Sequence, residues 1–438
     1  MLNWSAVERA LSEDHLLAGG RITRVSGSTL QATLPRAQTG AIYRIEGRDG
    51  RRNLLAEVIG FSDVDTILAP FGEARGIGPG DLVVPEGTSD QQLVSEEFLG
   101  RSIDPLGAPM DGGPPVHGKH LVPLYRSPPN PLTRQTIDTP LETGVSVIDG
   151  PNTVGRGQRM GVFAGPGVGK STLLGMIARF GTADVNVIAL IGERGREVRE
   201  FIERELGEEG RAKTVLIVAT GDAAPILRVR AALLATALAE YFRDHGRHVM
   251  LAMDSLTRLA HALREIGLSA GEPPTTRGYP PSVFSTLPKI LERAGNAEGP
   301  GTMTAFYTVL VDGDDMTEPI ADAARSILDG HLVLSRKIAE AGRYPAVDVP
   351  GSLSRVASEI IEPHHAMLAT QARAVMSHYE EVRELIQVGA YQTGSDPIVD
   401  RTVRLFPQVQ EVFQQGRNEH RTMSKTLGAL GAVLGGDK

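Results

Sequence analysis

GVFAGPGVGKSTLLGM, residues 161–176, joins an apolar run to a glycine-rich loop and then to a helical pattern. Glycines tolerate positive φ angles, which allows consecutive backbone N–H groups of such a loop to converge on one anion. A lysine and two hydroxyl residues follow at the start of the expected helix, whose N-terminal end carries partial positive charge. This order of elements predicts a loop that binds the phosphates of a nucleoside triphosphate.

The residues expected to bind the nucleotide are Gly165, Pro166, Gly167, Val168, Gly169, Lys170, Ser171 and Thr172. Lys170 supplies a positive charge for the β- and γ-phosphates, and Ser171 supplies a hydroxyl ligand for Mg²⁺. Ala164 stands where the strict pattern has its first glycine, at a strand end where a methyl group is tolerated. The alternative is a loop that only turns a strand into a helix.

Two carboxylates follow apolar runs that are predicted to be buried strands. Asp254 ends HVMLAMD (248–254), and Glu193 follows VNVIALIG (185–192). Because ligands bind at the carboxyl ends of the strands in open α/β sheets, both side chains are expected beside the loop. Asp254 is the candidate Mg²⁺ ligand, and Glu193 is the candidate group that activates the attacking water.

Each of these carboxylates also has a simpler interpretation. An aspartate after a strand is commonly a turn residue or a helix cap. The charged residues REVRE (196–200) have the spacing of a solvated, salt-bridged helix face. We expect that interpretation to hold for most of them, with Glu193 the exception because it lies at the carboxyl end of a strand.

The periodicity of apolar residues divides the chain into three expected domains. Residues 1–90 predict one short helix, with Trp4, Val7 and Leu11 at helical spacing, followed by the alternating runs of a small β-barrel. Residues 91–365 begin with a proline-rich connector and continue with alternating strands and helices, as a parallel α/β sheet requires. Residues 366–438 have helical spacing and are expected to end in a frayed terminus.

The expected strands of the α/β domain are MGVFA (160–164), VNVIALIG (185–192), TVLIVAT (214–220), HVMLAMD (248–254), MTAFYTVLV (303–311) and GHLVLS (330–335).

Composition narrows the classes of function. The 438 residues carry a formal net charge of −8 and include no cysteine. The negative charge gives no global field for a nucleic-acid backbone, so no nucleic-acid partner is expected. The missing thiols exclude disulfides and thiolate metal sites, which fits a cytoplasmic protein. The sequence shows neither a secretory signal nor a run of about 18 uncharged apolar residues, so any membrane association is expected to be peripheral.

Longer motifs carry a resemblance to a known family. Six segments together resemble the ATPases of type III protein export, relatives of the catalytic subunits of rotary ATP synthases: GRGQRMGVFAGPGVGKSTLL (155–174), IGERGREVREF (191–201), MDSLTRLAHALREIG (253–267), RGYPPSVFSTLPKILERAG (277–295), YTVLVDGDDMTEPIADAARSILDGHLVLSRK (307–337) and YPAVDVPGSLSRV (344–356). The flagellar members of this family fit the motifs best, and the injectisome members share most of the other motifs. The resemblance implies a RecA-like P-loop core between the barrel and the helical domain.

The resemblance also implies roles for individual residues. Glu193 becomes the carboxylate that activates water, with Arg194 near the γ-phosphate. Non-catalytic rotary subunits resemble this chain but carry Gln at the position of Glu193, so the Glu indicates turnover of ATP. Arg355 becomes the arginine that reaches into the neighbouring subunit's site.

A base-binding site is implied in the same way. Tyr344 matches the aromatic side chain that stacks on adenine, although a tyrosine packed before a proline is the simpler interpretation. Phe406 and Phe413 are candidates for a second aromatic wall.

An arginine acting in trans implies a homo-hexameric ring. The implied partners are a type III export regulator, a stalk-like subunit, and export chaperones and substrates, met peripherally at the membrane export gate. Three other functions stay open: a Rho-like RNA translocase, a nucleotide-binding ring subunit without catalysis, and a subunit coupled to proton flux.

Overall fold

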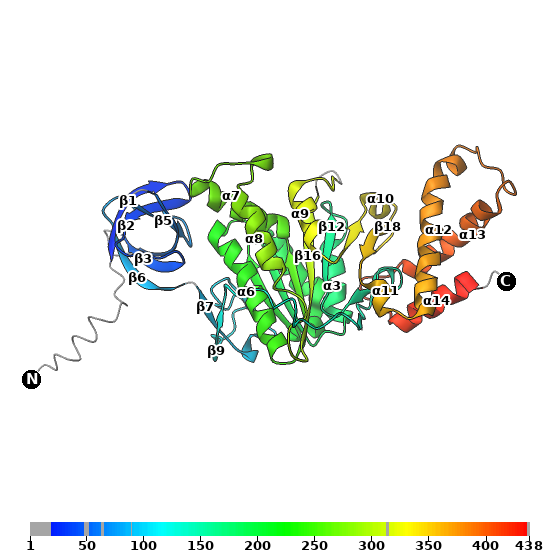
Figure 1. The fold of residues 1–438 in the computed structure, drawn as a ribbon, viewed down its shortest axis with the longest axis horizontal. Helices are drawn as coiled ribbons and strands as arrows, with labels where there is room; N and C mark the ends of the chain where they lie inside the picture. Colours follow the sequence, from blue (N-terminus) through cyan, green and yellow to red (C-terminus); the bar gives the residue numbers. More distant parts are fainter. Residues whose placement is uncertain (1–18, 48–51, 63–64, 89, 312–314, 436–438) are drawn as a thin grey trace, which may run out of the picture.

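The computed structural model describes residues 19–47, 52–62, 65–88, 90–311 and 315–435. Three parts follow one another along the long axis of the molecule: a barrel, a central α/β body and a helical end (Figure 1). The expected helix around Trp4, Val7 and Leu11 lies outside the described residues.

The first part is a closed barrel of antiparallel strands in the order β1-β2-β5-β4-β3-β6. Alternate residues of these strands point inward; in β3, for example, Ala41, Tyr43 and Ile45 are buried. The predicted barrel is therefore confirmed. Its strands are β1 (Gly20–Ser26), β2 (Thr29–Thr33), β3 (Ala41–Glu46), β4 (Asn53–Ser62), β5 (Asp65–Pro70) and β6 (Leu82–Thr88).

The central body contains an eight-stranded sheet in the order β18-β17-β12-β16-β15-β13-β14-β8. All neighbours pair in parallel except β17 and β18. The inner strands are buried on both faces, which explains their continuous apolar sequences. The strands are β8 (Ser102–Ile103), β12 (Arg159–Ala164), β13 (Val185–Ile191), β14 (Thr214–Ala219), β15 (His248–Asp254), β16 (Thr302–Leu310), β17 (Gly330–Leu334) and β18 (Val347–Ser354).

All six predicted strands are present, and the sheet has two further edge strands. β8 was missed because it has only two residues, inside the stretch predicted to be a connector. β18 was missed because Pro350 and Gly351 interrupt its pattern. The α/β prediction is confirmed, with this antiparallel edge added to it.

Helices cover both faces of the sheet. One face packs against α6 (Pro225–Asp244), α7 (Leu256–Ser269), α8 (Pro281–Leu291) and α9 (Pro319–Ile327). The core of the other face contains residues of α3 (Lys170–Phe180), η2 (Phe201–Leu206), α12 (Pro363–Gln387), α13 (Pro397–Phe413) and α14 (Met423–Gly435). The shorter helices are η1 (Glu96–Phe98), α2 (Ser146–Asp149), α4 (Gly195–Glu200), α5 (Gly207–Ala212), η3 (Thr276–Gly278), α10 (Arg336–Glu340) and α11 (Ala357–Ile360).

The C-terminal helices correct one expectation. The terminus is not frayed as far as Gly435, because Leu430 and Leu434 of α14 are buried in the core that the sheet shares with α12 and α13.

Among the described residues, none of the helices combines the length and the apolar character that crossing a membrane requires.

The passage between barrel and sheet is more ordered than the extended connector that the prolines predict. β7 (Gln91–Val94) pairs with β9 (His120–Pro123), and β10 (Pro140–Leu141) pairs with β11 (Val154–Gly155). A buried ion pair fixes its middle: Arg293 donates to both carboxylate oxygens of Glu240, at 2.9 and 2.7 Å, and to the carbonyl oxygen of Leu124 at 2.6 Å. The connector is thus fastened to α6 and to the end of α8.

We predict that Arg293→Met lowers the free energy of unfolding by about 3–5 kcal/mol, because Glu240 is left as a buried charge without its partner. The double variant Arg293→Met/Glu240→Leu should recover much of this loss, since neither charge remains. Urea unfolding followed by circular dichroism measures both. A double variant as unstable as the single one would contradict the explanation, and the exposed Arg199→Met is the control with little expected effect.

Candidate active site

The glycine-rich loop lies between the end of β12 and the start of α3. Gly167 and Gly169 have φ angles of +77° and +93°, the left-handed region that glycine tolerates best. α3 begins at Lys170, directly after the loop. A Cβ atom at Gly169 would lie 3.6 Å from the Tyr344 ring, so the loop and this aromatic side chain are close neighbours.

Lys170 is the centre of an ion cluster at the carboxyl edge of the sheet. Its Nζ lies 2.5 Å from Asp254 Oδ1 and 3.3 Å from Glu193 Oε1. The two carboxylates meet because β13 and β15 are neighbours, with Leu190 opposite Asp254. Thr308 of β16 donates a hydrogen bond to the same Asp254 oxygen at 2.7 Å, which fixes the carboxylate from the next strand.

Burial and the neighbouring opposite charges shift the pKa values of Lys170 and Glu193 in opposite directions. Burial raises the pKa of the Glu193 carboxyl; Lys170 opposes this rise and a hydrogen bond with Glu197 adds to it, so the net shift is upward. Burial alone would lower the pKa of Lys170, but the charges of Asp254 and Glu193 outweigh it and hold this pKa above its ordinary value. The lysine is therefore a permanent cation, while Glu193 is a carboxylate that accepts a proton readily.

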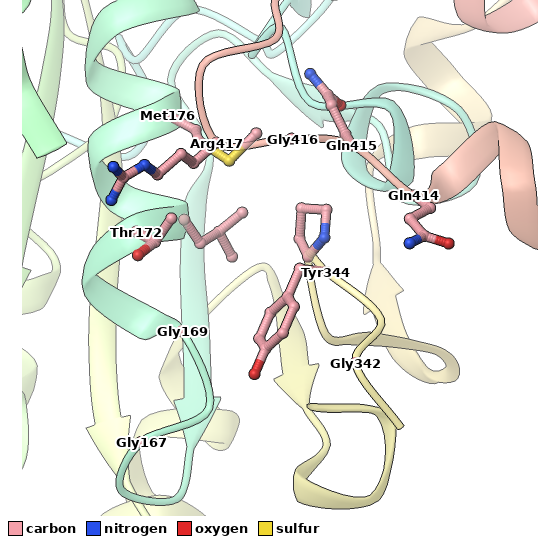
Figure 2. A pocket seen from close by; sticks show the side chains of 12 residues that line it. Gly167, Gly169, Thr172, Met176, Gly342, Tyr344, Gln414, Gln415, Gly416 and Arg417 are labelled. Atoms are coloured by element: carbon pink, nitrogen blue, oxygen red, sulfur yellow. The ribbon is translucent and has the colours of Figure 1, made fainter. Parts of the chain in front are cut away.

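Two cavities meet at the loop and share Gly167, Gly169 and Thr172. The loop cavity, about 420 Å³, is lined by residues 165–167 and 169–172, by Glu193, Arg194 and Arg258, and by acidic side chains after β13. The Tyr344 cavity, about 550 Å³, is bounded by α3, Tyr344 and residues 414–417 (Figure 2). A charged cavity beside a more apolar one fits a ligand with a phosphate end and a flat apolar end.

The two candidates for a second aromatic wall lie in different places. Phe413 lines a smaller cavity of about 30 Å³ together with Tyr344 and Pro345. Phe406 instead stacks on Tyr379, with ring centroids 3.6 Å apart. In the Tyr344 cavity, α3 lies across from the tyrosine, and the polar segment that follows α13 closes one end between them (Figure 2).

The charged residues after β13 form a solvated face, as expected. Arg196 pairs with Glu200 and Arg199 with Glu203, and all four side chains are exposed. Arg194 also points outward: its side chain is 82% exposed and lies 3.4 Å from Glu197. Glu193 is the exception, only 16% exposed and paired with Lys170.

Arg355 follows the last residue of β18, away from the loop. It is exposed, and its Nη2 donates to the carbonyl oxygen of Arg325 at 3.3 Å. The lining of both cavities, as far as the described residues form it, does not include Arg355. Within one chain the structure therefore brings together Lys170, Glu193 and Asp254, and leaves Arg355 apart from them.

The sequence predictions missed several residues around the two cavities. Arg258 lines the loop cavity from the first turn of α7, and its position four residues after Asp254 was a usable signal. Thr308 lies in the middle of a strand with an apolar sequence, where a threonine is common and gives no signal of function. Gln415 and Arg417 line the Tyr344 cavity, and their distance along the chain from the loop hides them.

A parallel sheet with this loop at the end of a central strand, and a lysine held there by two carboxylates, defines a P-loop nucleotide-binding protein. Three family models match the chain: the β-barrel domain of the ATP synthase alpha/beta family over residues 22–87, the nucleotide-binding domain of that family over 144–354, and the T3SS EscN ATPase C-terminal domain over 361–432.

Individual relatives match over nearly the full length. The flagellum-specific ATP synthase of Pseudomonas aeruginosa is 48% identical over 420 residues, which are 95% of this chain and 93% of that protein. The type 3 secretion system ATPase of Xanthomonas euvesicatoria is 48% identical over 414 residues, 94% of this chain and 93% of that protein. The assembled ATPase EscN of enteropathogenic E. coli superposes with a TM-score of 0.88 and 43% identity, covering 95% of this chain and 100% of the EscN chain.

The chain belongs to the ATP synthase alpha/beta family, among the ATPases of type III protein export. The resemblance seen in the sequence is thereby confirmed, and with it the expected class of enzyme, an ATP hydrolase with a nucleotide substrate.

We predict that Gly169→Ala lowers the free energy of unfolding by about 1–2 kcal/mol, since an alanine is strained at its positive φ. Affinity for ATP should fall with it, because relief of the strain turns the loop N–H groups away. Urea unfolding and calorimetric titration with ATP measure the two effects. Gly428→Ala on the exposed side of α14 is the matched control, where a Cβ atom meets nothing within 4 Å; equal behaviour of both variants would contradict the prediction.

Proposed function

We propose that this protein is a Mg²⁺-dependent ATP hydrolase of the flagellar export apparatus, with Glu193 as the group that activates water. The observation that carries the proposal is the largely buried Glu193 carboxylate beside Lys170 at the glycine-rich loop. Burial raises the pKa of Glu193, which suits a group that must accept a proton near neutral pH.

ATP binding follows from the two cavities. The phosphates lie in the loop cavity, against the N–H groups of residues 165–172 and the ammonium group of Lys170. The adenine lies in the Tyr344 cavity against the tyrosine ring. The ammonium group of Lys170 then contacts the β- and γ-phosphates as well as the carboxylates of Asp254 and Glu193.

The donor atoms beside the loop fit magnesium. Ser171 exposes its hydroxyl to the loop cavity, and Asp254 adds a carboxylate; both are the oxygen ligands that Mg²⁺ takes. Within the described residues no group of three or more His, Cys, Asp or Glu side chains is placed to hold a metal ion alone. Held there by Ser171 and Asp254, Mg²⁺ would offset negative charge on the substrate's phosphates.

Hydrolysis is then a transfer of the γ-phosphoryl group to water. Glu193 orients the water and accepts its proton, the water oxygen bonds to the γ-phosphorus, and the bond to the β-γ bridging oxygen breaks to leave ADP. Lys170 balances negative charge on the leaving phosphates. Arg194, exposed at the rim of the loop cavity, turns toward the γ-phosphate when ATP is bound.

We further propose a homo-hexameric ring in which Arg355 of one chain completes the site of its neighbour. Arg355 is exposed and separate from its own cavities, as a residue acting in trans must be. A structural relative is described as the assembled ATPase EscN, and another as EscN in complex with its central stalk EscO. A stalk-like subunit is the first expected partner; a regulator and export chaperones with their substrates follow, at the cytoplasmic side of the export gate.

Glu193→Gln should leave ATP binding intact and reduce turnover by about 10²–10⁴-fold, because the amide cannot accept the proton of water. Calorimetric titration measures binding, and phosphate release measures turnover. In the parent protein kcat/KM should fall on acidification through a pH above the ordinary carboxyl range, since the pKa of Glu193 is raised and its protonated form is inactive. The residual activity of the variant should lack this acid limb.

Turnover of Glu193→Gln at the parental rate would refute the role of Glu193. The same allele in the source cell tests the flagellar assignment: it should stop export of flagellar subunits and leave cells without filaments. Loss of effector secretion from cells that still swim would assign the protein to an injectisome.

Arg355→Ala should spare assembly and lower the ATPase rate by about 10³-fold, the scale of a lost arginine finger. Mixed with the parent protein, it should poison neighbouring sites, so activity should fall faster than the fraction of variant chains. ATPase assays over a series of mixing ratios measure this, with Arg199→Ala as an exposed control. A strictly proportional loss would argue against a shared site.

A further inference from the structure

The segment between α13 and α14, residues 414–421, forms part of the wall of the Tyr344 cavity, and we call it the strap. Its first four residues line the Tyr344 cavity (Figure 2). Seven of its eight residues are not fully buried, and one, Gln415, is only 3% exposed. A single buried side chain thus fixes a largely exposed piece of the cavity wall.

The side-chain amide of Gln415 is hydrogen-bonded through both its oxygen and its nitrogen. Its Oε1 accepts from the N–H of Ser146 at 2.9 Å, and its Nε2 donates to the carbonyl oxygens of Gly144 at 2.8 Å and Glu419 at 2.6 Å. Its backbone N–H donates to the carbonyl oxygen of Tyr344 at 2.9 Å. One residue therefore joins the start of the α/β body, the strap and the tyrosine.

The strap is also fastened to the helix that follows the phosphate loop. Arg179, near the end of α3, donates to the carbonyl oxygen of Arg417 at 2.5 Å and to Asn418 Oδ1 at 3.0 Å. The next residue, Phe180, stacks on His420 with ring centroids 5.4 Å apart. The strap thus links Tyr344, on one side of the cavity, to α3, on the other.

We propose that Gln415 is a positioning residue that sets the separation between Tyr344 and the phosphate loop, so that the base and the phosphates of ATP are bound together. This rests on the proposed placement of adenine in the Tyr344 cavity. If the amide is lost, Ser146 N–H and two carbonyl groups lose their buried partner, and the strap moves to find new ones. Affinity for the base then falls, while the groups around Lys170 keep their geometry.

Gln415→Glu tests this in the full chain, because the carboxylate keeps the size of the amide and faces the carbonyl oxygens of Gly144 and Glu419 without a proton to donate. KM for ATP should rise about tenfold with kcat within about twofold, as expected when binding rather than chemistry is weakened. The inhibition constant of tripolyphosphate, which has no base, should stay unchanged. Gln415→Met, of similar length and uncharged, should behave alike and decides the matter if the Glu variant does not fold.

Gln408→Glu is the matched control: the same chemical change on the exposed face of α13, where Gln408 Nε2 donates to the carbonyl oxygen of Arg404 in its own helix. It should leave KM unchanged. Tyr344→Ala separates the two levels of the proposal and should raise KM for ATP on its own.

Parental KM in both Gln415 variants, with a raised KM in Tyr344→Ala, would overturn the role of Gln415 alone. Parallel rises in the KM for ATP and in the inhibition constant of tripolyphosphate would show a general loss of structure and would also overturn it. An unchanged KM in Tyr344→Ala would overturn the placement of the base, and the Gln415 proposal with it.

Discussion

The ammonium group of Lys170 lies between the carboxylates of Asp254 and Glu193, at the edge where parallel strands end. Burial disfavours the charged form of a carboxylate, and at Glu193 the cation opposes this effect. The same cation is the group that phosphates need. In the proposed function this ammonium group also contacts the phosphates of ATP, so the carboxylates that hold it in position border the phosphate site.

The register of the sheet makes this cluster possible. β12, β16, β15 and β13 are neighbours, and from them come the loop, Thr308, Asp254 and Glu193. Because the inner strands are buried on both faces, they cannot slide without exposing apolar side chains. Helices α6 and α7 on one side and α3 on the other keep the edge rigid. The positions of the charged groups are therefore set by the apolar core, which carries the strands that bring them together.

Features that depend on local sequence patterns were predictable, and features that depend on contacts between distant segments were not. The strands, the loop and the carboxylates after β13 and β15 depend on local patterns and on one rule of α/β sheets, so they were predictable. The two-residue strand β8, the fastened connector and the buried end of α14 depend on contacts between distant segments, which no local pattern records. Gln415 is the clearest case: its partners Gly144 and Ser146 lie far away along the chain, and a glutamine after a helix is unremarkable in sequence.

The strap connects the proposed nucleotide site to the C-terminal helices. It begins where α13 ends and leads into α14, and both helices share a core with the sheet. A ligand in the Tyr344 cavity would therefore contact the segment that connects two helices of the C-terminal part. In the proposed ring, Arg355 faces the neighbouring site from the end of β18, whereas the strap lies within the helical end of its own chain. Arg355 and Gln415 lie on different segments and hold different partners, so their substitutions should act independently.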